Sequence, residues 1–95
     1  MKITTGIDII EVERIKQNIL DNNDFVQKIF TDNEIAYCEK SNAHKYEKYA
    51  ARFATKEAVY KALDIKDNSN ILWKDIEITN LENGKPSIIL NGNLT

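Results

Sequence analysis

The chain has 95 residues, of which 42% are hydrophobic and 29% charged, and its formal net charge is −2. This length predicts a single domain over residues 1–95. No apolar run approaches the ~20 residues that span a bilayer, and acidic residues directly follow the first apolar stretch, so we expect neither a membrane span nor a signal peptide. The single cysteine, Cys38, excludes an internal disulfide and a multi-cysteine zinc site. We therefore expect a cytoplasmic protein in which Cys38 is a packed thiol.

The first half of the chain predicts one strand and three short helices. KITTGIDII (residues 2–10) alternates as a strand, with Ile7 and Ile9 on one face. Apolar residues then recur at helical spacing over residues 12–20, and again over residues 25–30 after the polar break DNND. Thr31 followed three residues later by Glu34 is a capping-box pattern, which predicts that a third helix begins there.

The second half predicts a long helix followed by a hairpin. The helix runs from about His44 to Leu63. DIEITNL (residues 75–81) then alternates as a strand with Ile76 and Ile78 on one face. A tight turn through Asn83-Gly84 leads to a return strand, SIIL (residues 87–90), with Pro86 in a permitted position at its start. This order predicts an α+β fold with a small antiparallel sheet. After the hairpin, NGNLT leaves an apolar sheet edge that we expect another chain or a further strand to cover.

The long helix holds most of the positive charge of the chain. Residues 41–63 have five basic and two acidic side chains, whereas the segments on both sides are net acidic. On a helical projection the basic residues form a stripe opposite an aromatic and alanine face. This basic stripe consists of Lys45, Lys48, Arg52 and Lys56. We expect it to be a solvated helix face, or else the contact for an anionic partner. Glu57 and Lys61 instead project into the aromatic and alanine face, where charges are uncommon unless something pairs with them.

Three side chains suggest chemistry on phosphates. Asp8 shares a strand face with Gly6, which leaves space beside the carboxylate, and Glu57 and Lys61 form an i,i+4 pair. Magnesium is usually held by one or two carboxylates together with water and phosphate oxygens, and a lysine can neutralise a phosphate. The three side chains therefore fit a minimal phosphoryl-transfer site. From spacing alone, a solvent-facing Asp8 and an ordinary helix ion pair remain open as alternatives.

The sequence gives less support to other kinds of catalytic or binding site. The chain has only three glycines and lacks both standard glycine-rich phosphate loops. His44 is the only histidine and has no second metal ligand or nucleophile close to it in sequence, which argues against a catalytic triad or a zinc site. A nucleic-acid interface would use the basic stripe with Tyr49 and Tyr60, but the acidic total and the lack of a recognised motif argue against it.

Two segments together resemble a known family. GIDIIEVERI (residues 6–15) and RFATKEAVYKA (residues 52–62) are similar to the two signature motifs of holo-acyl-carrier-protein synthases, the small 4′-phosphopantetheinyl transferases. The NGKP turn (residues 83–86) also matches, and the similarity covers nearly all of the chain. The resemblance implies a phosphopantetheinyl-transferase-like fold and a Mg²⁺-dependent transfer of 4′-phosphopantetheine from coenzyme A to a serine of apo acyl carrier protein, in fatty acid biosynthesis. It also implies a homotrimer with active sites between protomers.

The same resemblance implies roles for individual residues. Asp8 and Glu57 correspond to the magnesium ligands, and Lys61 to the catalytic lysine that contacts the phosphates. Arg14 corresponds to the residue that engages the carrier protein. The nucleotide end of coenzyme A is expected to bind the residues Arg52, Asn83, Gly84, Lys85 and Pro86.

The chain departs from the family pattern in two places. The family continues past position 95 with a last strand, so we expect this sequence to be truncated at its C-terminus. The first helix is also less basic than a carrier-protein dock, because Asp21 and Asp24 follow Arg14. An alternative is a non-catalytic module of the same fold that docks an acidic carrier protein. Such a module has no need for Asp8 and Glu57 to converge.

Overall fold

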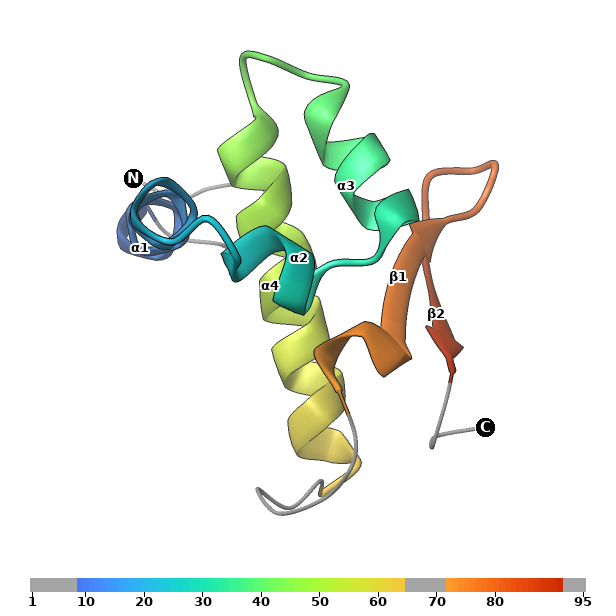
Figure 1. Ribbon diagram of the computed structural model, residues 1–95. Coiled ribbons are helices and arrows are strands. Elements are labelled where there is room, and N and C mark those ends of the chain that lie inside the picture. The colour runs from blue at the N-terminus through green and yellow to red at the C-terminus, as the bar shows by residue number, and fades with distance from the viewer. Residues whose placement is uncertain (1–8, 65–71, 92–95) are drawn as a thin grey trace.

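The computed structural model describes residues 9–64 and 72–91, which form four helices, a short 3-10 turn and one hairpin (Figure 1). The α+β architecture with a small antiparallel sheet, predicted from the sequence, is confirmed. Among the helices of these two ranges, none combines the length and the apolar character that crossing a bilayer requires. In chain order the elements are α1 (Ile9–Asp21), α2 (Phe25–Ile29), α3 (Asp32–Glu39), α4 (Lys45–Ala62), η1 (Trp73–Asp75), β1 (Ile76–Asn80) and β2 (Pro86–Leu90).

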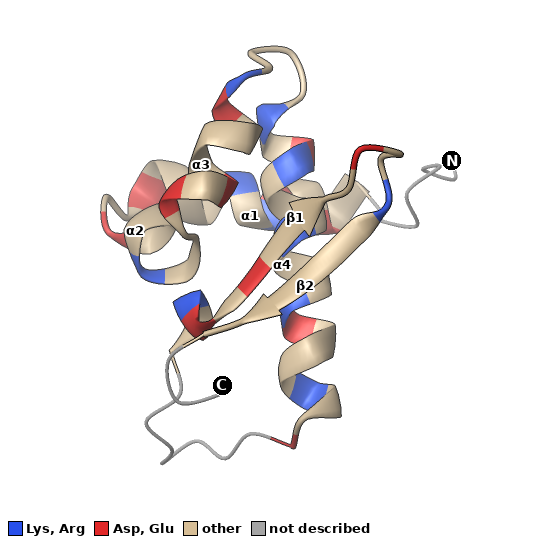
Figure 2. Ribbon diagram, turned by 90° about the vertical axis from the view of Figure 1, so that its right-hand side faces the viewer, with Lys and Arg blue, Asp and Glu red and all other residues tan. Residues whose placement is uncertain are grey.

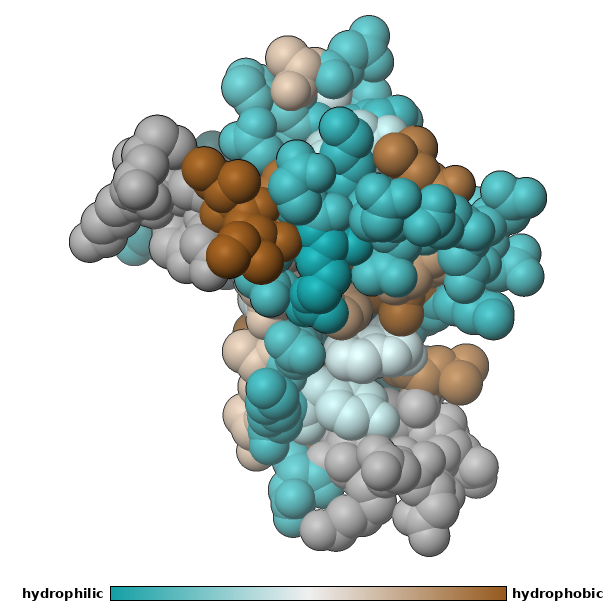
Figure 3. All heavy atoms as spheres, turned by 90° about the vertical axis from the view of Figure 1, so that its left-hand side faces the viewer, coloured by the Kyte–Doolittle hydropathy of each residue, from teal (hydrophilic) through white to brown (hydrophobic). Residues whose placement is uncertain are grey.

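Helix α1 begins at Ile9, three residues before the helical spacing expected over residues 12–20. Ile9 and Ile10 belong to the helix and are exposed, so their assignment to a strand was wrong, while residues 2–8 of that predicted strand lie outside the described residues. Ile9, Val12 and Ile15 also recur at the three-residue spacing of a helix. At Ile9 and Ile10 the chain follows this helical spacing and not the two-residue alternation of a strand. Where α1 faces the viewer in Figure 3, hydrophobic side chains gather beside the grey residues and hydrophilic ones cover most of the remaining surface.

The hairpin has the predicted strands and turn. Ile76 and Ile78 are buried, as expected, and Ile78 is paired with Ile88 across the sheet. Gly84 has a φ of +86°, a conformation that glycine adopts without strain. The amide of Gly84 donates to the carbonyl of Leu81 at 2.8 Å, so the chain reverses within residues 81–85. Figure 2 shows the hairpin crossing in front of α4, and this arrangement brings its turn close to residues of that helix.

The core lies where the four helices meet. The ring centroids of Phe30 and Tyr49 are 5.0 Å apart, and Ile15 and Cys38 complete the buried cluster beside them. The packed environment predicted for Cys38 is therefore confirmed. A second aromatic contact joins α4 to η1, where Tyr60 stacks on Trp73 with 4.7 Å between ring centroids. These contacts fix how α4 is rotated about its own axis.

The basic stripe of α4 is not the solvated face that the sequence suggested. Lys56 is 0% exposed and Arg52 only 7%, because α3 and the hairpin cover this side of the helix. Ala54, Ala58 and Ala62, which the projection had assigned to the apolar face, are exposed instead. Charge pattern alone gave the wrong orientation because the two buried cations have polar partners on other elements.

Candidate active site

One buried carboxylate fixes α4 against the rest of the molecule. Glu34 forms the predicted capping box: its amide donates to Thr31 Oγ1 at 3.2 Å, and Thr31 N donates to Glu34 Oε1 at 2.8 Å. The same carboxylate accepts a hydrogen bond from Lys56 Nζ at 2.5 Å and one from the amide of Ile78 at 2.8 Å. It therefore joins α3, α4 and β1 at a single point. Side chains that project from α4 are positioned by this junction.

Burial and pairing act on Lys56 in opposite directions. Removal of its ammonium from water lowers the pKa of Lys56, and the hydrogen bond and charge of Glu34 oppose this shift. Both side chains are 0% exposed. Such a pair holds its members in one geometry, and the loss of either partner leaves the other charge buried alone.

Arg52 connects α4 to the hairpin turn. Its Nη2 donates to Asn80 Oδ1, and its guanidinium carbon lies 4.0 Å from the centroid of the Tyr37 ring. Asn80 in turn donates from Nδ2 to the carbonyl oxygen of Gly84 at 2.9 Å. Two of the predicted nucleotide-binding residues, Arg52 and Gly84, are thus linked through one side chain. The sequence motifs did not indicate Asn80. Its place as the last residue of the strand before the turn was the one sign that its side chain would lie near the nucleotide-binding residues.

An open pocket of about 620 Å³ lies beside this link. Arg52 and Pro86 from the predicted nucleotide-binding set line it, whereas Asn83, Gly84 and Lys85 are exposed in the adjoining turn. The pocket lining also contains Lys48 of α4, which belongs to the basic stripe, and Tyr37 of α3, which the sequence did not indicate. Arg52 Nε is buried and has no hydrogen-bond partner among the described residues. Lys48 and Arg52 thus bring positive charge to the pocket.

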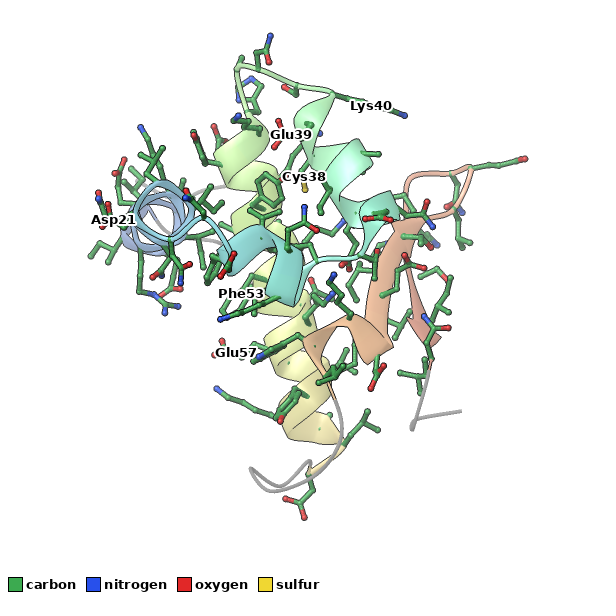
Figure 4. The ribbon with its side chains drawn as sticks, in the orientation of Figure 1. Asp21, Cys38, Glu39, Lys40, Phe53 and Glu57 are labelled. Carbon is green, nitrogen blue, oxygen red and sulfur yellow. The ribbon has the colours of Figure 1, made fainter. Side chains whose placement is uncertain are left out.

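Glu57 and Lys61 lie on a different side of α4. At 100° per residue, Glu57 is about 140° and Lys61 about 180° around the helix from Arg52. Figure 4 shows Glu57 pointing away from the hairpin, towards the side of α4 on which α1 lies. Glu57 is half-buried and Lys61 is exposed, so the expectation that both project into a packed face was wrong. Tyr46 and Phe53 on this side are themselves only half-buried, which leaves the charged ends in reach of water.

Arg14 is the predicted site residue that lies near Glu57. It is exposed on α1 and forms an ion pair with Glu11 at 2.5 Å. The hydrogen bond to Glu11 raises the pKa of Arg14, and the negative charge of Glu57 contributes in the same direction. The structure therefore brings Glu57 and Arg14 to one side of the molecule. Asp8, the other predicted magnesium ligand, lies outside the described residues.

The chemistry of Glu57 fits a divalent cation. Its side chain makes no hydrogen bond or ion pair with any residue in 9–64 or 72–91, so both oxygens are available as ligands. Within these ranges no three potential metal-ligating residues cluster. A site with one or two carboxylates, completed by water and phosphate oxygens, is the arrangement that Mg²⁺ commonly adopts. Among the described residues, Glu57 thus supplies one carboxylate of such a site.

Comparisons with known proteins identify relatives over nearly the whole chain. The model of the 4′-phosphopantetheinyl transferase superfamily matches residues 4–95. The holo-[acyl-carrier-protein] synthase of Solibacter usitatus is 45% identical over 93 residues, which cover 97% of this chain and 74% of the relative.

Two solved structures share the fold. The holo-(acyl-carrier-protein) synthase from Bacillus anthracis, solved in complex with CoA (3′,5′-ADP), matches 90% of this chain and 72% of its own, with a TM-score of 0.72 and 36% identity. The holo-ACP-synthase from Plasmodium yoelii matches 87% of this chain and 63% of its own, with a TM-score of 0.66 and 30% identity. The chain thus spans between 63% and 74% of the length of these three proteins. The family and the enzyme class predicted from the two motifs are confirmed, and the chain belongs to the 4′-phosphopantetheinyl transferase superfamily.

Proposed function

We propose that this chain transfers 4′-phosphopantetheine from coenzyme A to a serine hydroxyl of apo acyl carrier protein, in the cytoplasm and in fatty acid biosynthesis. The family match and the 45% identity to a holo-[acyl-carrier-protein] synthase support this reaction. The structural observation that carries it is the carboxylate of Glu57, which is accessible, has no partner among the described residues and lies near Arg14. A carboxylate with a purely structural role is normally paired, as Glu34 is.

The reaction exchanges a phosphoanhydride bond of coenzyme A for a phosphoester bond to the serine. The serine oxygen of the carrier protein forms a bond to the phosphorus that bears pantetheine, and the bond from that phosphorus to the bridging oxygen breaks. Adenosine 3′,5′-bisphosphate leaves with the bridging oxygen, and the serine proton is released. Mg²⁺, when bound by Asp8 and Glu57 and the pyrophosphate, supplies positive charge that favours departure of the phosphate. Lys61 adds a second positive charge beside the phosphates, which matters most as the leaving group becomes more negative.

The remaining residues bind and orient the two substrates. Arg14 contacts the carrier protein, which docks on the side of the molecule where Glu57 lies. Arg52 and the turn of Asn83, Gly84, Lys85 and Pro86 hold the nucleotide end of coenzyme A, an assignment supported by the link from Arg52 through Asn80 to Gly84.

The active site is formed between protomers of a homotrimer. Arg52 and the residues Glu57 and Lys61 project from α4 in directions about 140–180° apart, so one short molecule cannot easily contact both groups of one chain. Two exposed apolar surfaces are available for assembly. One is formed by Ala54 and Ala58 on α4, and the other is strand β2, where Ile88 and Ile89 lie on opposite faces and are 50% and 41% exposed. Strand β2 pairs only with β1 among the described residues, so its outer edge can accept a neighbour.

The decisive experiment incubates the chain with apo acyl carrier protein, coenzyme A and Mg²⁺ and measures the intact mass of the carrier. We expect the carrier to gain one phosphopantetheine group, and this gain to be lost with Glu57→Gln or with a chelator present. Glu39→Gln is the control, because Glu39 is bonded to Lys45 and Tyr49 and belongs neither to the pocket lining nor to the side of Glu57. Carrier binding without any gain in mass would instead identify a non-catalytic docking module.

A further inference from the structure

A second pocket, of about 420 Å³, lies between α2, η1 and the C-terminal part of α4. The residues that line it are Gln27, Lys28, Tyr60, Leu72, Trp73 and Lys74. None of them has a role in the proposed reaction. The ring of Tyr60 stacks on that of Trp73, with 4.7 Å between the centroids and 24° between the planes, and Leu72 is 64% exposed. The second pocket therefore offers a flat aromatic wall and an aliphatic side chain to a ligand.

The charged side chains of the second pocket are both lysines. Among the described residues that line it, Lys28 of α2 and Lys74 of η1 carry charge, and no acid does. The side chain of neither lysine forms a hydrogen bond or an ion pair within residues 9–64 and 72–91. The charge of Lys74 is also felt nearby: burial lowers the pKa of Lys56, and Lys74 adds to this shift. Two unpaired cations beside apolar side chains favour a ligand that joins an apolar body to a negative charge.

The second pocket is closer to Glu57 around the helix than the first pocket is. At 100° per residue, Tyr60 is about 60° around α4 from Glu57, whereas Arg52, which lines the first pocket, is about 140° away. The ring of Trp73 also contacts that of Phe53, with 5.4 Å between the centroids, so three rings follow one another along this side of α4. A molecule bound at Glu57 can therefore extend a flexible arm to the second pocket without crossing to the far side of the helix.

We propose that the second pocket binds an apolar group that carries a carboxylate, with the apolar body against Tyr60 and Leu72 and the carboxylate at Lys28 and Lys74. Two sources offer this chemistry. One is a free fatty acid, and the other is a coenzyme A thioester whose acyl group ends in a carboxylate. For the thioester the inference rests on the proposed function, because the arm starts from the phosphates bound near Glu57. The bonds formed and broken in the transfer are then unchanged, and the acyl group stays on the thiol sulfur.

Trp73 is the only tryptophan of the chain, so its fluorescence reports binding in the second pocket directly. Three probes separate the two parts of the ligand: octanoate has both, octanol has the apolar body alone, and inorganic phosphate has the charge alone. Octanoate should change the emission of Trp73 and bind about 10-fold more tightly than either of the other probes. Lys28→Gln and Lys74→Gln should each remove most of this preference and leave the affinity for octanol unchanged. The matched control is Lys40→Gln, because Lys40 is exposed at the end of α3 and does not line the pocket.

The second arm of the test identifies the source of the carboxylate. Glutaryl-coenzyme A and valeryl-coenzyme A differ only in that a carboxylate replaces the terminal methyl group, and both are offered as donors to apo acyl carrier protein. If the acyl end of the donor occupies the pocket, the glutaryl thioester should have a KM about 10-fold lower, and Lys28→Gln should remove the difference while kcat stays the same. If octanoate binds and the two thioesters have equal KM values, the ligand is a free acid.

The outcomes separate this inference from the proposed function. The carboxylate site is refuted if octanoate leaves the emission of Trp73 unchanged, if octanol binds equally well, or if both lysine variants keep the full preference. Displacement of octanoate by an equal concentration of inorganic phosphate would also refute it, because the apolar body would then contribute nothing. Failure of the proposed function gives a different result: no donor adds mass to the carrier, whereas octanoate still binds and still requires Lys28 and Lys74.

Discussion

Glu57 and Lys61 differ from the other charged residues near them on α4. Lys56 is in a buried ion pair and Arg52 is hydrogen-bonded to the hairpin, whereas the side chains of Glu57 and Lys61 have no hydrogen bond or ion pair within the described residues. Groups without internal partners contribute little to folding, because water solvates them equally well in the unfolded chain. Their contribution is therefore expected in the reaction.

We expect Glu57→Ala to abolish transfer and Lys61→Ala to lower the single-turnover rate by roughly 10²-fold or more, the scale for loss of one positioned electrostatic group. The melting temperature of both variants should remain close to that of the intact protein. Rapid-quench kinetics and circular dichroism on the same samples measure the two effects. A lowered melting temperature with an unchanged rate would show that Glu57 and Lys61 stabilise the fold and take no part in the reaction.

Cys38 predicts how stability depends on pH. Burial raises the pKa of the Cys38 thiol from 9.0 to about 12, so the native chain keeps its proton in a range where the unfolded chain loses it. The free energy of unfolding should then fall as pH rises from 9 towards 12. Burial also raises the pKa of Tyr49, which adds to the loss at alkaline pH. Urea unfolding between pH 7.5 and 10.5 should show this decline, and Cys38→Ala should make it shallower. A decline of equal slope in Cys38→Ala would contradict the assignment.

At the scale of the elements, the junction at Glu34 joins two helices to the sheet. Loss of one partner from a buried ion pair typically costs about 3–5 kcal/mol, because it leaves the other charge buried alone. We expect losses of this size for Lys56→Met and somewhat larger ones for Glu34→Leu, since Glu34 also accepts from Thr31 N and Ile78 N. Urea unfolding measures both variants.

The double variant Glu34→Leu with Lys56→Met should recover part of this loss, because neither buried charge then remains. The matched control is the more exposed pair of Lys45 and Glu39, with 3.4 Å between its charged atoms, where Lys45→Met should cost about 1 kcal/mol or less. A double variant no more stable than Glu34→Leu would show that the hydrogen bonds to Thr31 and Ile78 dominate the junction.

Elements with local signals could be predicted from the sequence, and burial that depends on distant partners could not. The capping box at Thr31 and the turn at Gly84 each depend on residues within a few positions, and both are confirmed. Lys56 and Arg52 were misplaced because their partners lie 22 and 28 residues away in sequence. The same reason explains why the motifs indicated Arg52 but not the Tyr37 ring against which it packs.

At the scale of the whole molecule, a site shared between protomers predicts complementation. Glu57→Ala and Arg52→Gln each inactivate a different half of the proposed site. In a closed ring assembled at random from equal amounts of both variants, about a quarter of the interfaces combine two intact halves. We expect the mixture, after dissociation and reassembly, to recover roughly that fraction of the intact activity.

Each variant alone is the control for complementation and should be inactive at the same total concentration. Dilution of the intact protein should also lower its specific activity as the assembly dissociates. A mixture as inactive as its components, from variants that both fold and assemble, would mean that each active site is complete within one chain.

The junction at Glu34 also determines when the protein can finish folding during its synthesis. Glu34 and Lys56 leave the ribosome well before Ile78, whose amide donates to the second oxygen of Glu34. Until the hairpin arrives, the carboxylate and the ammonium remain open to water and the basic side of α4 is uncovered. The nascent helical segment therefore waits for the hairpin, and a product that lacks the hairpin exposes a charged interior surface that quality-control proteases can distinguish from the native fold.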